Sequence, residues 1–154
     1  MEKKKKQKDV KRLFGPEGFK DMGFTHLLFN LFAQGCAFLK FEYSGGGDSG
    51  CIDWVTAFKL EDVKVDPDEN LYEVVDDHTL LELEEKLQKH IESVITDKIL
   101  EKADDWWNND GGGGTLWVDC RDASYYGDHY INIIQTEESK LTGYLGDSAN
   151  QKED

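Results

Sequence analysis

Apolar residues recur at helical spacing in two segments of the chain. In the first, Pro16 suits the first turn of a helix and Gly35 suits its end, because glycine readily takes the left-handed conformation that closes many helices. The second begins at Thr79, whose spacing from Glu82 matches a capping box, and runs to about Lys102. The two apolar stripes are Phe24, Leu27, Leu28, Leu31 and Phe32, and Leu80, Leu83, Leu87, Ile91, Val94 and Ile95. These spacings predict two amphipathic helices.

Elsewhere, apolar and polar residues alternate, which is typical of half-buried strands. Alternation over Ala37–Tyr43 leads into a glycine-rich turn at residues 44–50, and a second alternating run follows, with Ile52, Trp54, Phe58 and Leu60 on one side. The pair predicts a β-hairpin. Two further strands are expected at Gly114–Arg121 and at His129–Thr136, with a turn between them at Asp122–Asp128. Residues 61–78 are acidic and contain Pro67, so they predict a loop, with at most a short strand at Val63–Val65.

The order of these elements is α-β-β-α-β-β. It predicts an α+β fold in which two helices pack on one face of a four-stranded antiparallel sheet. We expect a basic flexible tail at residues 1–14, a single domain at residues 15–137 and a polar tail at residues 138–154. A length of 154 residues suits one domain with a real core.

Charge is distributed unevenly along the chain. Residues 1–12 carry seven positive and two negative side chains, a net of +5; because the whole chain carries −14, the remainder carries −19. An acidic body repels nucleic-acid phosphates and attracts basic protein surfaces, including those of proteins that bind nucleic acid. The alternative is that the acidity serves only solubility.

Composition argues against a secreted or membrane protein. No run of about 18 apolar residues is present, and the basic N-terminus lacks the apolar stretch of a signal peptide. The three cysteines Cys36, Cys51 and Cys120 have no CxxC spacing, so we expect free thiols in a reducing compartment rather than disulfides or a zinc site. The expected location is the cytoplasm.

Two glycine-rich segments are the strongest candidates for a binding site. In Gly47-Asp48-Ser49-Gly50, Asp48 and Ser49 could project into a site, or the segment could simply be a hairpin turn. It also resembles the nucleophile loop of trypsin-like proteases, but the chain is too short for two barrels and has no suitable histidine and aspartate upstream. In Trp106–Gly114, the tryptophans could anchor a loop, or Asn108, Asn109 and Asp110 could line a polar pocket.

Recognisable metal and catalytic sets are missing from the sequence. Asp66, Asp68 and Asn70 match the first three ligand positions of a calcium loop, but Leu71 stands where glycine is required. The four histidines lack ligand spacing, and none is paired with a cysteine or serine in a recognisable motif. We therefore expect no catalytic residue, metal or cofactor.

Two stretches together resemble a family of small uncharacterised proteins of bacteria, plasmids and phages. The first family motif is a turn of the form GxGDSGxI(D/E), and the second is a loop of the form WxNNxGxxG. The matching residues are Gly45, Gly47, Asp48, Ser49, Gly50, Ile52 and Asp53, then Trp106 or Trp107, Asn108, Asn109, Gly111 or Gly112, and Gly114. Cys51, the doubled tryptophan and the lysine-rich head depart from the pattern. The resemblance implies a mobile-element origin and no particular reaction.

Charge and motifs together favour a non-enzymatic interaction protein. A phage- or plasmid-encoded inhibitor could occupy the basic nucleic-acid-binding groove of a host protein, as an anti-defence or anti-CRISPR protein would. One alternative is a small metal- or nucleotide-binding domain or enzyme in which the two loops converge at one end of the sheet. Another is an acidic immunity or scaffold protein. The residues expected to bind a ligand or partner are Asp48, Ser49, Asp53, Asn108, Asn109 and Asp110.

Overall fold

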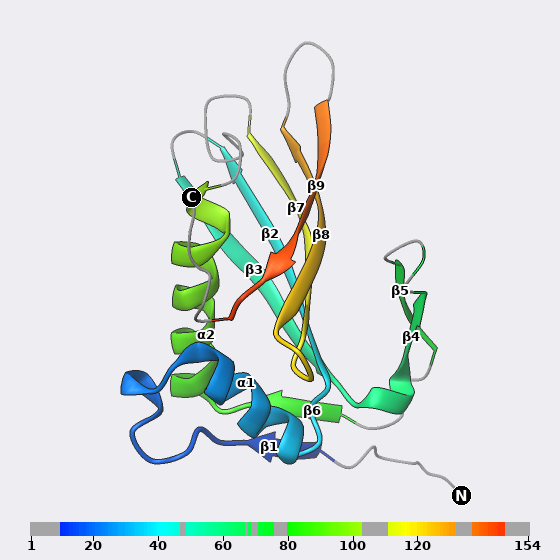
Figure 1. Ribbon diagram of the computed structural model, residues 1–154. Coiled ribbons are helices and arrows are strands. Elements are labelled where there is room, and N and C mark those ends of the chain that lie inside the picture. Colours follow the sequence, from blue (N-terminus) through cyan, green and yellow to red (C-terminus); the bar gives the residue numbers. More distant parts are fainter. Residues whose placement is uncertain are drawn as a thin grey trace, which may run out of the picture.

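The fold is taken from a computed structural model of the chain (Figure 1). The structure describes residues 10–46, 49–66, 68, 71–75, 80–102, 111–131 and 137–146. The two helices are α1 (Phe24–Ala33) and α2 (Glu85–Lys98). The strands are β1 (Val10–Leu13), β2 (Phe38–Gly46), β3 (Ser49–Phe58), β4 (Val63–Asp66), β5 (Leu71–Val74), β6 (Leu80–Leu83), β7 (Gly112–Asp119), β8 (Ser124–Ile131) and β9 (Glu137–Tyr144). Short 3-10 turns lie at Phe19–Asp21, Leu60–Asp62 and Leu100–Lys102.

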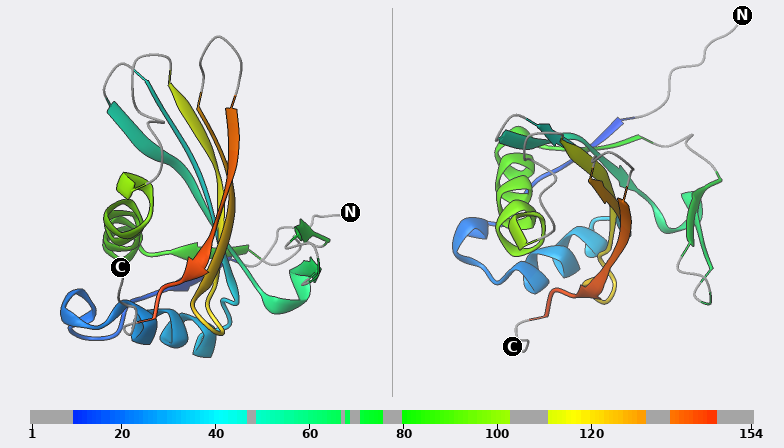
Figure 2. Two further views of the ribbon diagram at one scale, coloured as in Figure 1. Left: turned by 45° about the horizontal axis from the view of Figure 1, so that its top comes forward. Right: turned by 90° about the horizontal axis from the view of Figure 1, so that it is seen from above.

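Seven of the strands form one sheet, in the order β1-β6-β3-β2-β7-β8-β9. All neighbours are antiparallel except β1 and β6, which run parallel. The sheet curves around α1 and α2, which both lie on its concave side (Figure 2). The remaining two strands, β4 and β5, form a separate hairpin that stands on the opposite, outer side. The predicted four-stranded antiparallel sheet is therefore wrong.

The predicted first hairpin is confirmed, as is a helix that ends before Gly35, but this helix begins at Phe24 and not near Pro16. Strands β2 and β3 pair antiparallel from Phe38↔Phe58 to Gly46↔Ser49. Helix α1 ends at Ala33, and Gly35 follows with a positive φ of 108°, as expected of a residue just beyond a helix end. The predicted face of the second strand is wrong, because a bulge at Asp53 leaves Ile52 against the concave core and Trp54 67% exposed.

The second helix begins later than predicted. Residues Leu80–Leu83 form β6, in which Leu81 and Leu83 are buried and Glu82 between them is exposed. Glu84 caps α2 instead, because its carboxylate accepts hydrogen bonds from the backbone N–H groups of Lys86 (2.9 Å) and Leu87 (3.3 Å). The predicted capping box is wrong, since its Glu82 lies in a strand; Thr79 lies outside the described residues.

Strands β1 and β9 lie in segments that the sequence assigned to tails. In β1, which spans residues 10–13, Leu13 is fully buried and Arg12 forms an ion pair of 2.7 Å with Glu82 of the parallel strand β6. Strand β9 spans residues 137–144, and its Leu141 packs against the core. The ordered sheet therefore includes residues 10–13 and 137–144.

The last long hairpin is also placed differently from the prediction. Strand β8 begins at Ser124, because a tight turn at residues 120–123 with Ala123 at φ 61° connects it to β7. Glycines 112–114 belong to β7 rather than to a loop. A Cβ atom on Gly113 or Gly114 would collide with the backbone carbonyl of a neighbouring strand, so glycine is needed for these strands to approach.

Apolar side chains are buried on both faces of the sheet. The main core lies on the concave side and contains the buried residues of α1, α2 and the inner face. A smaller core on the outer side contains Ala37, Phe38, Phe58, Val63 and Trp117, with Tyr72 of β5 stacked on Trp117 at 5.1 Å between ring centroids. The β4–β5 hairpin thus covers the lower part of the outer face, and the upper part carries exposed side chains of β2, β3, β8 and β9.

All three cysteines are free thiols, as the sequence predicts. Cys36 and Cys120 are buried, and a hydrogen bond between them together with their burial raises the pKa of Cys120 well above its ordinary value. The Cys120 thiol is therefore protonated, and both buried cysteines act as small apolar core residues.

Candidate functional site

Most of the residues predicted to bind a ligand lie outside the described part of the chain. This holds for Asp48, Asn108, Asn109 and Asp110, and for the side chain of Ser49, whose backbone begins β3. The described ends of the two glycine-rich segments lie side by side, because Gly45 pairs with Gly112 between β2 and β7. Convergence of the side chains themselves stays a prediction.

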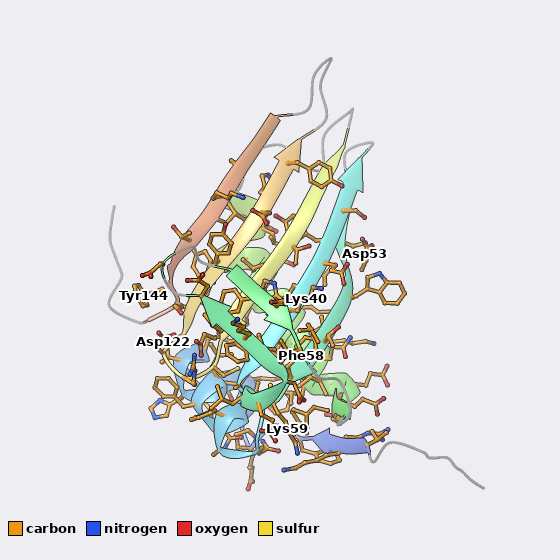
Figure 3. The ribbon with its side chains drawn as sticks, turned by 90° about the vertical axis from the view of Figure 1, so that its right-hand side faces the viewer. Lys40, Asp53, Phe58, Lys59, Asp122 and Tyr144 are labelled. Atoms are coloured by element: carbon orange, nitrogen blue, oxygen red, sulfur yellow. The ribbon has the colours of Figure 1, made fainter. Side chains whose placement is uncertain are left out.

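Asp53 is described, and a β-bulge determines its position. Glu42 of β2 pairs with Trp54 and the next residue, Tyr43, pairs with Ile52, so Asp53 has no partner across the strands. Its carboxylate accepts hydrogen bonds from Ser44 Oγ (2.6 Å) and Cys51 Sγ (3.5 Å). Loss of solvation and this bond to Asp53 raise the pKa of Cys51. The bulge therefore holds the Asp53 carboxylate on the outer face (Figure 3).

Trp54 is the most exposed tryptophan among the described residues. Its side chain is 67% exposed, whereas that of Trp117 is 7% exposed. Strand pairing places it directly opposite Glu42 on the outer face, and Asp53 precedes it in the bulge. The same row of the sheet continues through Thr115 to Asp128. A large aromatic surface thus lies beside two carboxylates.

On the described part of this outer face, the carboxylates outnumber the basic groups. Lys140 forms an ion pair with Asp128, and Arg121 forms one with Asp119. Lys40 lies over the Trp117 ring, 5.4 Å from its centroid. Three further carboxylates of this face, Glu42, Asp53 and Asp122, form no ion pair with another described residue. The face is therefore acidic where it is most exposed.

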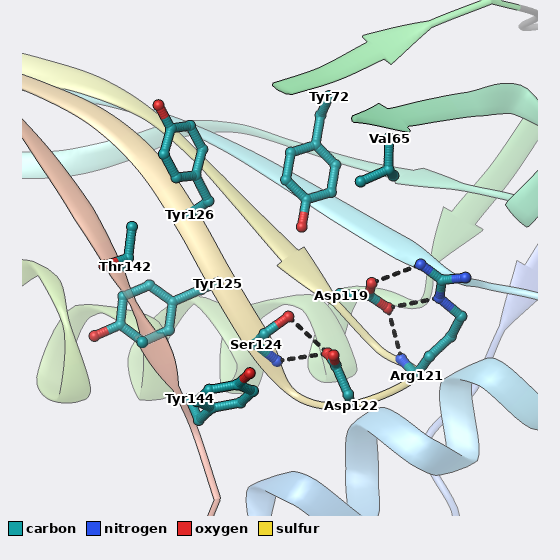
Figure 4. Close-up of a pocket in the computed structure, with 11 residues that line it drawn as sticks. Val65, Tyr72, Asp119, Arg121, Asp122, Ser124, Tyr125, Tyr126, Thr142 and Tyr144 are labelled. Carbon is teal, nitrogen blue, oxygen red and sulfur yellow. Dashed lines mark hydrogen bonds and ion pairs between the residues drawn. The ribbon is translucent and has the colours of Figure 1, made fainter. Parts of the chain in front are cut away.

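A groove of about 450 Å³ lies between the β4–β5 hairpin and strands β8 and β9 (Figure 4). We call it the hairpin groove. It is lined by Val65, Tyr72, Asp119, Arg121, Asp122, Ser124, Tyr125, Tyr126, Thr142, Gly143 and Tyr144. A neighbouring cavity of about 350 Å³ shares Val65 and Arg121 with it and extends to Phe38, Leu60 and Val63.

The turn between β7 and β8 forms the polar floor of the hairpin groove. Asp119 is 5% exposed and accepts hydrogen bonds from the backbone N–H (2.9 Å), Nε (3.0 Å) and Nη2 (2.8 Å) of Arg121. The Arg121 guanidinium also lies over Phe38, 5.1 Å from the ring centroid. Asp122 Oδ1 accepts bonds from Ser124 N–H (3.0 Å) and Oγ (2.6 Å). These bonds fix both carboxylates before any ligand binds.

Tyrosines form the walls of the hairpin groove. Tyr72 comes from β5, Tyr126 from β8 and Tyr144 from β9, and Tyr144 is 72% exposed. Burial, followed by the negative charges of Asp119 and Asp122, raises the pKa of Tyr72 to about 12. Arg121 acts in the opposite direction on this pKa, but burial and the two carboxylates outweigh it.

The concave side contains a buried polar pair. Tyr43 Oη and His129 Nδ1 are 2.7 Å apart, and each residue is 2% exposed. Burial, followed by the charges of Tyr130 and Asp128, raises the pKa of Tyr43. Gly114 of β7 pairs with both residues, so the bond links β2 to β8 across a strand that has no side chain at that position.

A family model matches residues 23–142 of the chain. The chain belongs to DUF6878, a family of unknown function. The DUF6878 match begins one residue before α1 and ends within β9, so it contains both glycine-rich segments, the β4–β5 hairpin and most of the hairpin groove. Strand β1 and Tyr144 lie outside it. No curated protein matches the chain, and no solved structure does.

Two classes of site find no support in the described part of this DUF6878 protein. There, no three His, Cys, Asp or Glu side chains are grouped so that they could hold a metal ion. No described helix has the length and apolar character that a membrane crossing requires.

Sequence reasoning named Asp53 but missed the hairpin groove. The sequence predicts a turn at residues 122–128 and a tail from residue 138 onward, and neither prediction places their tyrosines on a shared surface. The outward alternation of Ser124, Tyr126 and Asp128 is a strand signal in the sequence. The contribution of Tyr72 could not be found in this way, because it depends on how a distant hairpin packs.

Proposed function

We propose that this chain is a non-enzymatic acidic interaction protein whose outer sheet face binds a basic protein surface. The observation that carries the proposal is the exposed indole of Trp54, which lies directly opposite Glu42 and beside Asp53. An arginine or lysine side chain on such a site gains a cation–π contact with the ring and ion pairs with the carboxylates. Tryptophan is also among the residues that contribute most to protein interfaces.

Nucleic acid is a poorer fit to the same surface. Exposed aromatic residues on a sheet are also typical of proteins that bind single strands, where bases stack on the rings. Those proteins add positive charge along the strand path, whereas the carboxylates beside Trp54 and a net charge of −14 repel phosphate. The partner that suits both the ring and the charge is a basic protein.

The partner we favour is itself a nucleic-acid-binding protein. Its basic groove would meet the acidic body, and the bound chain would exclude nucleic acid, as expected of a phage- or plasmid-encoded inhibitor of the anti-CRISPR type. The excess of −19 outside residues 1–12 supports this choice. An immunity or scaffold role would use the same face on a basic partner without competing with nucleic acid.

The test measures binding of a short fluorescent arginine-rich peptide by anisotropy at low salt. We expect Trp54→Ala to weaken binding about tenfold, since exposed interface anchors contribute more than 1 kcal/mol. Glu42→Gln should weaken it about threefold, in keeping with an exposed ion pair. The matched control is Glu85→Gln, because this exposed glutamate lies on α2, on the other side of the sheet.

Equal affinities for Trp54→Ala and the unchanged chain would contradict the proposal. Trp54 is exposed, so its removal should leave the thermal unfolding midpoint nearly unchanged, and a loss of binding would not reflect unfolding. Displacement of a short DNA duplex from the same peptide by the chain would support the inhibitor role, and formation of a ternary complex would favour the scaffold role.

A second candidate is ligand binding by the two glycine-rich loops. The pairing of Gly45 with Gly112 supports it, because it brings the described ends of both loops together. A rise in unfolding temperature with Mg²⁺, Mn²⁺, Ca²⁺ or a nucleotide, abolished by Asp48→Ala, is the expected result. An unchanged unfolding temperature with all of these would eliminate the candidate.

A further inference from the structure

The hairpin groove carries one net negative charge among its described side chains. Asp119 and Arg121 neutralise each other through three hydrogen bonds, and Asp122 is the third charged group in the lining. Asp122 Oδ1 accepts both hydrogen bonds from Ser124, so Oδ2 has lone pairs to offer a ligand. A cation entering the groove therefore meets a fixed carboxylate.

Three aromatic rings surround the same space. Tyr72, Tyr126 and Tyr144 come from three different strands, and their ring faces attract positive charge. Lys140 lies 6.0 Å from the centroid of the Tyr126 ring, so this ring already contacts a cation within the protein. Tyrosine hydroxyls and Ser124 Oγ add hydrogen-bond acceptors around the carboxylate.

An anionic ligand suits the groove less well, although Arg121 lines it. The guanidinium is held by Asp119 and packs over Phe38, so an anion would have to compete with a bidentate ion pair within the protein. It would also approach the carboxylate of Asp122, which lines the same groove. The arrangement therefore selects against phosphate and carboxylate groups.

We propose that the hairpin groove binds an arginine side chain presented by the basic partner. A guanidinium is planar, stacks on aromatic rings and donates hydrogen bonds in several directions, which matches tyrosine walls with a carboxylate between them. A space of about 450 Å³ holds such a side chain together with part of its backbone. The identity of the arginine donor rests on the proposed function; the choice of guanidinium rests on the groove alone.

The test is an amide NMR titration of the full chain with N-acetyl-arginine N-methylamide. Saturable shifts are expected at Asp122, Ser124, Tyr126, Thr142 and Tyr144. The citrulline analogue has nearly the same shape and no charge, so it should bind at least about fivefold more weakly, which corresponds to the loss of one exposed ion pair and one cation–π contact. Equal affinity for the two analogues, or shifts confined to other surfaces, would overturn the inference.

Two groove variants and one control complete the experiment. Asp122→Asn removes the charge but keeps an oxygen that can accept the bonds from Ser124, so the turn should persist. Tyr144→Thr removes a wall at a position that is 72% exposed and therefore tolerates change. Each should weaken arginine-analogue binding about threefold or more. Glu85→Gln, on α2 at the other side of the sheet, should leave it unchanged. Undiminished binding by both groove variants would refute the assignment.

Failure of this inference is distinguishable from failure of the proposed function. Peptide binding that depends on Trp54 but produces no shifts in the groove would support the outer face as the docking surface and refute the arginine site in the groove. Specific binding of the arginine analogue in the groove, together with no affinity for the peptide, would support the arginine site and refute a basic protein as the partner.

Discussion

The hydrogen bond between Tyr43 and His129 is expected to contribute to the stability of the sheet. The Tyr43 hydroxyl bonds to His129 Nδ1 at 2.7 Å between residues that are each 2% exposed. We expect Tyr43→Phe to lower the free energy of unfolding by about 1–2 kcal/mol, because a buried polar group loses a partner. Chemical denaturation measures the change. Tyr144→Phe is the matched control, since its hydroxyl is on a 72% exposed residue, and an equal loss in both variants would contradict the role given to this bond.

Tyr72 links the electrostatics of the hairpin groove to stability at high pH. Its pKa rises from 10.0 to about 12 on folding, so between these values the folded chain keeps a proton that the unfolded chain has lost. The free energy of unfolding is therefore unaffected by this group below pH 10 and falls as the pH rises toward 12. Denaturation at several pH values should show a shallower decline for Tyr72→Phe. Parallel declines would mean that the groove does not hold the phenol neutral.

At the scale of elements, the N-terminus of α2 depends on one carboxylate. Glu84 accepts hydrogen bonds from two N–H groups of the first turn, and Glu85 beside it forms only an exposed ion pair with Lys89 at 3.3 Å. Glu84→Ala should lower the free energy of unfolding by about 1 kcal/mol, and Glu85→Ala by no more than about half of that. Urea titration of both variants measures the difference. A larger loss for Glu85→Ala would place the cap elsewhere.

Local sequence patterns predict the elements whose apolar residues lie close together in the chain. They fail for strands whose pairing partner is far away in the sequence. Leu80–Leu83 fits both a helical and an alternating pattern, and the choice of strand depends on pairing with β1, about 70 residues earlier in the chain. In β1, Val10, Lys11 and Arg12 are all exposed and Leu13 is buried, so this strand has no alternation to recognise. Strand β9 lies at the edge of the sheet, where polar residues are common and the apolar signal is weak.

In the candidate site, too, local features can be predicted from the sequence and long-range features cannot. Asp53 could be named from the sequence, but its outward position results from a bulge that only the register of β2 and β3 reveals. The hairpin groove joins β5 to β8 and β9, so no local pattern encodes it. The sequence alone shows the negative net charge. The fold shows that some of the acidic side chains lie on the outer face, beside the exposed indole of Trp54.

At the scale of the whole molecule, the curved sheet separates two kinds of surface. Its concave side is filled by α1 and α2, and its outer side presents Trp54 and the hairpin groove. A basic partner bound to the outer face would lose affinity as salt rises, because exposed ion pairs are screened. The affinity of the arginine-rich peptide should fall steadily with added salt, and a salt-independent affinity would contradict an electrostatic docking face.

The most direct measurement follows the indole N–H resonances of the full chain as the arginine-rich peptide is added. The resonance of Trp54 is identified by its absence in Trp54→Ala, and Trp117, 7% exposed, provides an internal reference. The account predicts a saturable shift of the Trp54 indole and a much smaller shift of Trp117. A Trp54 resonance that stays in place while the peptide binds would show that the outer face is not the docking surface.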